Sequence, residues 1–277
     1  MKNVSLFISI VLITFVSCHE AVKQPGILPD SVRQEIIADT MTATLSAHPD
    51  MPPKSVDGLF DDFIYSFMTN RAFQMQRINF PLSVTDARSG HESFIPAAQW
   101  KHDRLYSIRQ TYVIIYDDAK AQSREKDTKT DRATVEWINF PKKSVKQYLF
   151  ARQNGLWKLI ALRYEAFKQN ANADFLNFYQ RFATDSVFQR KHVAATVNFT
   201  TYDTDNFEMV EGVVDVDQWF AFKPDLPYGE IVNVNYGQQY RNSHERIMVI
   251  NGLSNSMHSS LVFKRKGGQW ILTKFEN

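Results

Sequence analysis

Phenylalanines recur at helical spacing in two stretches of the chain that lie 115 residues apart. In each stretch they occupy positions i, i+3 and i+7, which lie on one face of an α-helix. A short polar residue follows, typical of the N-cap of a second helix that carries another phenylalanine inward. The pattern therefore predicts a helix and a short second helix, twice. The residues concerned are Phe60, Phe63, Phe67, Asn70 and Phe73 in the first stretch and Phe175, Phe178, Phe182, Asp185 and Phe188 in the second.

Strand-forming residues follow both pairs of helices. β-Branched and aromatic residues are frequent in residues 77–84 and 192–202. Each half ends with two apolar runs joined by a dipeptide that favours a tight hairpin turn, Asn154-Gly155 or Gly267-Gly268. In the first half a charged run, residues 117–132, separates the apolar runs 111–116 and 133–140. We interpret it as a solvated loop that joins the two strands of a hairpin.

The same landmarks occur in the same order in both halves, with Trp100 and Trp157 matched by Trp219 and Trp270. We interpret this as an internal duplication of one α+β unit, in which helices pack on one face of a curved antiparallel sheet. The order of helices and strands resembles the NTF2-like (cystatin-like) fold. Residues 55–277 resemble a Bacteroides-type lipoprotein family of unknown function with two tandem NTF2-like domains. The resemblance implies two cone-shaped domains, residues 57–167 and 173–277, and assigns no catalytic role.

The N-terminal residues have the features of a secretory signal. Lys2 precedes an apolar run, residues 4–16, which is shorter than the about 20 residues that span a bilayer. The sequence FVSC, which ends at Cys18, resembles the lipobox of bacterial lipoproteins and implies removal of residues 1–17 and acylation of Cys18. Residues 18–56 then form a tether with one short helix. The alternatives are a signal peptide that merely contains a cysteine, or an uncleaved anchor.

Cys18 is the only cysteine of the chain, so no internal disulfide can form, and acylation gives the residue a role. Two or three acyl chains hold a protein at a membrane stably, whereas one chain does not. We therefore expect the membrane to be a partner through acylated Cys18. The expected location is the cell envelope of a Gram-negative bacterium, at the outer membrane.

Charge and composition limit the partners and cofactors. The net charge is +2 with acids and bases interspersed, so no nucleic-acid partner is expected. The sequence contains no phosphate-binding glycine loop and no serine nucleophile elbow, and its seven histidines form no HxH or HxxxH pair. We therefore expect no cofactor and no metal. The 21 phenylalanines and 11 tyrosines instead favour aromatic cores.

The open mouth of an NTF2-like cone is where the resemblance places chemistry. Three residues of the first half, His91, His102 and Asp103, are candidates for acid–base work there, and the alternative is that they are ordinary surface residues. Trp100 and Trp219 occupy matching positions and are candidates for the wall of a ligand cleft. The alternative for these two is that each fills a core.

Three hydroxyl side chains follow an aspartate and precede a hydrophobic residue: Ser31, Thr40 and Ser186. This arrangement resembles the O-glycosylation sites of Bacteroides-type periplasmic proteins. Ser31 and Asp185 are also candidates for helix caps.

Three functions remain open at this point. The first is a membrane-anchored, non-catalytic module that binds an unidentified ligand or partner. The second is an enzyme with a single acid–base pocket in the first domain. The third is a structural envelope protein that acts through protein–protein contacts. The lack of a recognisable catalytic set favours the first.

Overall fold

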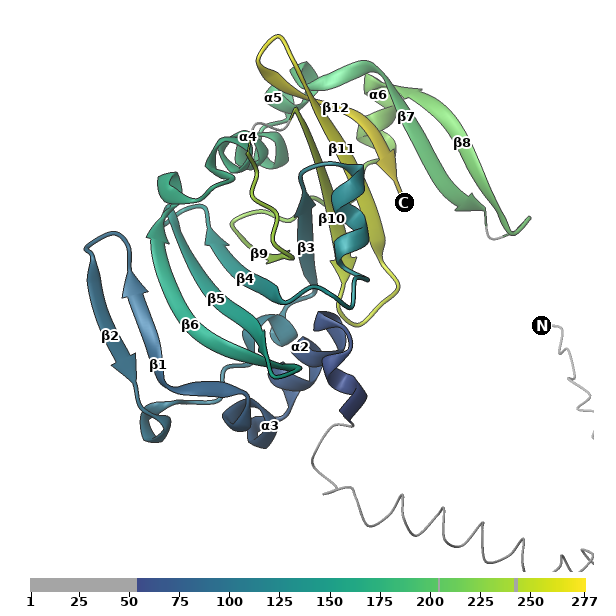
Figure 1. Cartoon of the computed structure of the whole chain (residues 1–277). Helices are drawn as coiled ribbons and strands as arrows, with labels where there is room; N and C mark the ends of the chain where they lie inside the picture. The colour runs from purple at the N-terminus through teal and green to yellow at the C-terminus, as the bar shows by residue number, and fades with distance from the viewer. Residues whose placement is uncertain (1–53, 204, 242–243) are drawn as a thin grey trace, which may run out of the picture. The chain divides into compact units, whose positions relative to one another are not determined.

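The computed structural model describes residues 54–203, 205–241 and 244–277. In these residues twelve strands form one curved mixed sheet, and helices pack against it (Figure 1). We call residues 54–169 the first half and residues 173–277 the second half. Within the described residues no helix is both long and apolar enough to cross a membrane.

Each half contains a pair of α-helices near its start, followed by strands. The first half contains η1 (Lys54–Asp57), α2 (Phe60–Thr69), α3 (Arg71–Gln76), β1 (Ile78–Asp86), β2 (His91–Ile95), η2 (Ala97–Gln99), η3 (Leu105–Ile108), β3 (Thr111–Tyr116), η4 (Ala119–Arg124), β4 (Arg132–Asn139), β5 (Ser144–Gln153), β6 (Leu156–Ala166) and η5 (Phe167–Gln169). The second contains α4 (Ala173–Thr184), α5 (Ser186–Lys191), β7 (Val193–Asp203), β8 (Glu208–Asp215), α6 (Val216–Phe222), β9 (Glu230–Asn235), β10 (Glu245–Gly252), β11 (His258–Lys266) and β12 (Gln269–Glu276).

The predicted helix pairs are confirmed, and so are their caps. Asn70 accepts a hydrogen bond from the Phe73 backbone at the start of α3, and Asp185 accepts two at the start of α5. A buried glutamine then ties the two helices of each pair together. Gln74 Nε2 donates to the Phe67 carbonyl at 2.8 Å, and Gln189 Nε2 donates to the Phe182 carbonyl at 2.7 Å. The shared glutamine is therefore a structural residue in both halves.

The closing hairpins are also confirmed. β5 joins β6, and β11 joins β12, through the two predicted dipeptides. Both residues of each turn have positive φ, 51° and 80° in the first and 56° and 80° in the second. Positive φ at both central positions matches the right-handed twist of the strands, which is why asparagine and glycine occupy these positions.

The predicted hairpin between residues 111–116 and 133–140 is wrong. β3 does not pair with β4, because β9 of the second half lies between them (Figure 1). β9 pairs antiparallel with β4, from Thr134 opposite Asn235 to Asn139 opposite Glu230. β3 in turn pairs antiparallel with β10 of the second half. The halves thus exchange one strand each, and the sheet runs without a break in the order β2-β1-β6-β5-β4-β9-β3-β10-β11-β12-β7-β8.

The sheet is mixed, whereas the sequence indicated an antiparallel one. β1 and β6 are parallel, β12 and β7 are parallel, and the exchanged strands β3 and β9 meet in parallel. The local pattern of residues cannot show this, because alternation of apolar and polar side chains reports on burial and not on strand direction.

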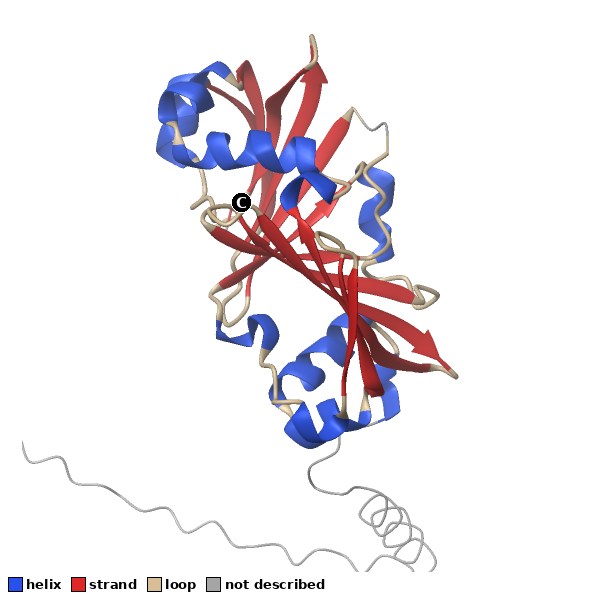
Figure 2. Cartoon of the chain, turned by 90° about the vertical axis from the view of Figure 1, so that its left-hand side faces the viewer, coloured by secondary structure: helices blue, strands red, loops and turns tan. Residues whose placement is uncertain are grey.

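Two hydrophobic cores lie on opposite faces of the sheet. Along β3, Val113 and Ile115 belong to one core and Ile114 and Tyr116 to the other. Successive side chains of a strand point to opposite faces, so α2 and α3 cover one face and α4 and α5 the other. Figure 2 shows one group of helices toward each end of the sheet and one short helix apart from both groups.

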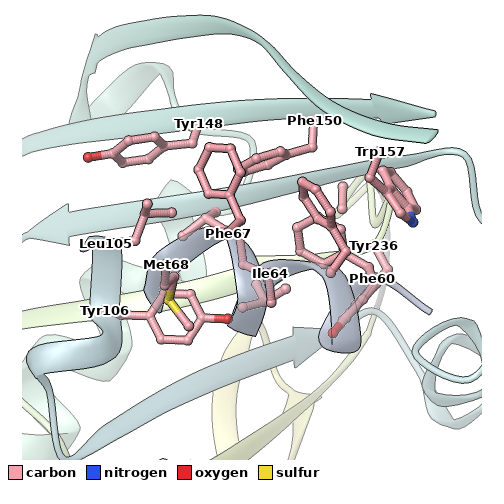
Figure 3. Close-up of a cluster of buried hydrophobic side chains, with 14 of the residues drawn as sticks. Phe60, Ile64, Phe67, Met68, Leu105, Tyr106, Tyr148, Phe150, Trp157 and Tyr236 are labelled. Carbon is pink, nitrogen blue, oxygen red and sulfur yellow. The ribbon is translucent and has the colours of Figure 1, made fainter. Parts of the chain in front are cut away.

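Each core takes side chains from both halves. In the first core the Phe60 ring packs edge to face against Phe150 and against Trp157. Tyr236 of the second half completes the cluster, with its ring centre 6.0 Å from that of Phe60 (Figure 3). Val113 and Ile115 of the first half are buried in the second core. The exchange therefore connects the two halves through packing as well as through hydrogen bonds.

Candidate functional site

A pocket of about 400 Å³ opens in the first half between the sheet and the segment that precedes η3. Aromatic side chains from β4 and β6, Trp137 and Tyr164, form part of its wall. The charged side chains of its lining are Arg88, Arg104, Lys142, Lys146, Asp103 and Glu230. Four cations therefore face two carboxyl groups, and this balance favours a ligand that carries negative charge.

Asp103 stands at the centre of the polar contacts in this pocket. The Tyr148 hydroxyl donates to Asp103 Oδ2 at 2.5 Å, and Lys146 Nζ donates to the Tyr148 oxygen at 2.5 Å. Lys146 Nζ also lies 3.5 Å from Asp103 Oδ2. Burial, and then the charge of Asp103, raises the pKa of Tyr148 above its ordinary value of 10. Tyr148 is therefore a neutral donor over the whole physiological range.

Gln74 fixes the position of Asp103. Its Nε2 donates to the Asp103 carbonyl at 2.7 Å, and its Oε1 accepts from the Asp103 backbone at 2.9 Å and from Trp100 Nε1 at 2.9 Å. The Leu105 backbone donates to Asp103 Oδ1 at 2.9 Å. Gln74, on the short helix α3, thus orients the acid of the pocket.

An ion pair between the halves borders the pocket. Arg109 pairs with Glu230, the first residue of the exchanged strand β9, and Asn139 donates to the same carboxyl group at 3.3 Å. The Arg109 guanidinium lies 4.8 Å from the centre of the Trp137 ring. A second hollow of about 440 Å³ lies beside this pair and shares Ile108 and Glu230 with the pocket. The second half therefore contributes a residue to the wall of the site.

The corresponding positions of the second half are apolar or small. The alignment of Phe150 with Phe263 places Ser259 and Leu261 where Lys146 and Tyr148 stand. The strand pairing places Ile250 opposite Ser259, as Trp137 stands opposite Lys146. Trp219 is fully buried in the second core, with its ring centre 5.0 Å from that of Phe275 and 6.4 Å from that of Phe182. The polar pocket therefore belongs to the first half.

A separate group of titratable side chains lies at the first core. Tyr236 donates to Asp61 Oδ1, and Tyr116 donates to Glu125 Oε2 at 2.6 Å. Burial raises the pKa of Asp61 from 3.8 to about 6, and the neighbouring Glu125 adds to the rise. The group joins α2 to the loop after β3 and to the end of β9.

The predicted site residues are only partly brought together. Asp103 lines the pocket, whereas His91 is exposed at the start of β2 and does not line any described pocket. His102 is half-buried, with its Nε2 buried and without a hydrogen-bond partner among the described residues. Trp100 is half-buried against Phe80 rather than at the pocket wall. Its placement, like that of Trp219, fits the core interpretation.

The remaining predicted sites are placed as follows. Ser186 is exposed at the first turn of α5. Cys18, Ser31 and Thr40 lie outside the described residues. Within the described ranges no three His, Cys, Asp or Glu side chains are grouped so that they could hold a metal ion.

Sequence reasoning missed Lys146, Tyr148, Trp137 and Tyr164. One signal could have found Lys146 and Tyr148. They lie two residues apart, and so on the same face, of a strand that matches a strand of the second half. The second half has a serine and a leucine at the matching positions, so a polar pair in one copy alone marks a face with a task other than packing.

Comparisons with known proteins agree with the fold. The family model described as "Domain of unknown function (DUF4348)" matches residues 37–277. A solved structure described as an NTF2-like protein from Bacteroides fragilis is 38% identical, with a TM-score of 0.73, over 82% of this chain and 98% of that one. No curated protein matches. The predicted similarity to the NTF2-like fold is thereby confirmed, and neither description names an activity.

Proposed function

The chain belongs to the DUF4348 family, and we propose that this member is a lipid-anchored envelope protein that binds a small anionic ligand in the pocket of its first half. One observation carries the proposal. Cationic, hydrogen-bonding and aromatic side chains converge on a hollow in one half, while the matching positions of the other half are apolar or small. Ligand pockets combine a largely apolar wall with a few oriented polar groups.

The lining also suggests the class of ligand. Trp137 and Tyr164 contribute aromatic surface to the wall, and Lys146 and Arg104 contribute positive charge. The Tyr148 hydroxyl donates to Asp103 and so orients this carboxyl group, which presents acceptor oxygens to a hydroxyl or amide group. An acidic sugar or a ring-bearing carboxylate has all three features.

The anchor and the duplication belong to the same proposal. The lipobox-like sequence supports acylation of Cys18 and a location at the outer membrane. Two helix pairs tied by equivalent glutamines, with two equivalent closing turns, support a tandem duplication with a boundary between residues 167 and 173. After such a duplication the pocket of one half can keep or gain a binding role, while the matching positions of the other half become part of a packed core.

Acid–base catalysis in the same pocket is the second candidate. It rests on Asp103, which lies within hydrogen-bond distance of a neutral tyrosine and near a lysine. A carboxyl group held in this way can take a proton from a bound ligand while its Oδ2 continues to accept from the Tyr148 hydroxyl. The third function, a structural envelope protein that acts through protein–protein contacts, would be favoured by two closed cones. It is not favoured here because the first half has an open pocket.

Native mass spectrometry of the full chain in a non-ionic detergent tests the proposal. We expect a non-covalent adduct that disappears on denaturation, and a covalent mass on Cys18 that remains. Tyr148→Phe combined with Lys146→Gln removes the pocket contacts and is expected to remove the adduct. Lys264→Gln, an exposed cation on β11, is the matched control. An adduct that persists in the pocket variant contradicts binding at this site.

A further inference from the structure

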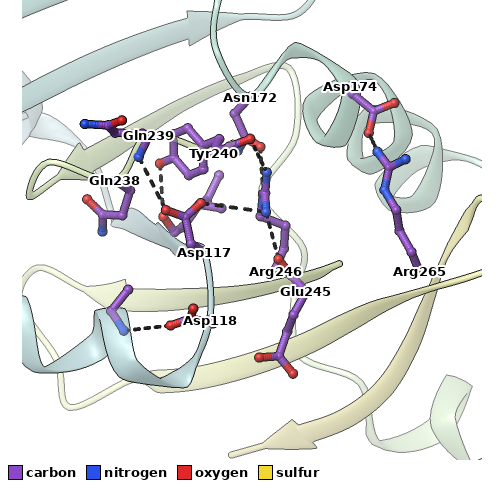
Figure 4. A network of polar contacts seen from close by, with 12 residues as sticks. Asp117, Asp118, Asn172, Asp174, Gln238, Gln239, Tyr240, Glu245, Arg246 and Arg265 are labelled. Atoms are coloured by element: carbon purple, nitrogen blue, oxygen red, sulfur yellow. Dashed lines mark hydrogen bonds and ion pairs between the residues drawn. The ribbon is translucent and has the colours of Figure 1, made fainter. Parts of the chain in front are cut away.

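A second polar pocket, of about 420 Å³, lies where the residues just before α4 and the start of α4 meet β10 and β11 of the second half; Figure 4 shows several of its side chains. Its lining includes Asn172, Asp174, His244, Arg246 and Arg265. None of these residues lines the pocket of the first half. The two pockets therefore have separate linings.

Two hydrogen-bond donors of this lining have no partner among the described residues. Asn172 is only 2% exposed, and its Nδ2 is buried without an acceptor. Arg265 Nε is likewise buried without an acceptor. An unpaired buried donor costs free energy, so such atoms are rare unless a water or a ligand satisfies them. Both atoms are donors, so the missing partner is an acceptor.

Arg246 brings a buried positive charge whose closest partners are neutral oxygens and whose ion pair, with Asp117, is long. It is 4% exposed, and it donates to Asn172 Oδ1 at 3.0 Å, to the Tyr240 carbonyl at 3.1 Å and to the Glu245 carbonyl at 2.8 Å. The carboxyl group of Asp117 lies farther away, with its Oδ1 3.7 Å from Arg246 Nη1. Burial lowers the pKa of Arg246, which reflects the cost of keeping this charge out of water. An additional anion offsets that cost.

The other charged groups define the entrance. Arg265 pairs with Asp174 in the first turn of α4, and Trp270 Nε1 donates to the same carboxyl group at 2.9 Å. His244 is exposed beside them. The start of a helix also favours negative charge. Asp174 therefore occupies part of a region that suits an anion, and it competes with a ligand for Arg265.

We propose that this pocket binds the oxyanion group of a small solute, a carboxylate or a phosphate, between Asn172, Arg246 and Arg265. One oxygen of the ligand accepts from Asn172 Nδ2 and another accepts from Arg265 Nε. The charge of Arg246 is then matched within the pocket. The site is independent of the ligand proposed for the first half.

Isothermal titration of the full chain in detergent, at constant ionic strength, tests this with inorganic phosphate and with citrate as probes and chloride as the reference. We expect one of the two oxyanions to bind, and the tighter of them identifies the class. Arg265→Gln is expected to weaken binding about tenfold, as the loss of a charged hydrogen bond does. Lys264→Gln, on the neighbouring position of the same strand, is expected to leave it unchanged.

Two further variants separate a binding role from a structural one. Asp174→Asn removes the competing carboxyl group and is expected to tighten binding. Asn172→Asp supplies an internal carboxyl group next to Arg246 and is expected to abolish binding while the thermal midpoint is kept or raised. The proposal is overturned if neither oxyanion binds better than chloride, or if Arg265→Gln and Asp174→Asn leave the affinity unchanged. The unpaired donors would then be satisfied by water.

Discussion

Replacing Gln74 with methionine tests how the pocket of the first half is held in place. Methionine has a similar size but cannot form the four hydrogen bonds that Gln74 makes with Phe67, Asp103 and Trp100. A typical hydrogen bond contributes about 1 kcal/mol net, so the expected loss of unfolding free energy is about 4 kcal/mol. This is a large part of the about 5–15 kcal/mol that stabilises a typical domain.

The second half supplies a matched control. Gln189 occupies the equivalent position and makes only the bond to the Phe182 carbonyl, while its Oε1 is buried without a partner among the described residues. Gln189→Met is therefore expected to cost about 1 kcal/mol. The two midpoints of urea unfolding should differ accordingly, at an unchanged dependence on urea concentration. Equal losses in the two variants would refute the reasoning.

Three further measurements follow from the structure. The raised pKa of Asp61, about 6 against 3.8, means that the folded chain binds this proton more tightly, so stability falls as pH rises from about 4 to about 6. Asp61→Asn should stabilise the protein by roughly 2–3 kcal/mol near neutral pH, and below about pH 3.5 the urea midpoints should coincide. Trp219→Ala should cost about 3–5 kcal/mol of unfolding free energy because the side chain is fully buried, and a loss below about 1 kcal/mol would argue for a cleft position instead. Cys18→Ala should move the protein from the membrane pellet to the supernatant on cell fractionation, and retention in the pellet would contradict lipid anchoring.

The helices and the closing turns could be predicted because their signals are local. Phe60, Phe63 and Phe67 fix the buried face of a helix within eight residues, and Asn154-Gly155 fixes a turn by its own backbone preference. The strand exchange has no local signal. β3 and β9 are both strands of six residues that are largely buried, and each can pair with β4 as far as side-chain pattern is concerned. Packing of whole halves decides the outcome.

The candidate site was predicted only through Asp103. Lys146 and Tyr148 read as ordinary positions of an amphipathic strand, and Glu230 lies more than eighty residues away from them in the chain. Glu230 lies near Lys146 and Tyr148 only because the order of strands in the sheet places β9 beside β4, and that order depends on the exchange of β3 and β9. The same holds for Asn172 and Arg246, which lie 74 residues apart in the chain and meet through a hydrogen bond between the residue before α4 and β10. Sites of this kind are visible only in three dimensions.

The exchanged strand β9 also determines when, during synthesis, the sheet and the pocket of the first half can be completed. When the first half leaves the ribosome, β4 has no neighbour on one side, because residues 230–235 have not yet been made. That open edge is a place where a second nascent chain can pair. Glu230 arrives with the same strand, so the pocket wall is completed only after most of the chain has been translated. A truncated product that lacks residues 230–277 would therefore have an unpaired β4 edge and an unfinished pocket wall.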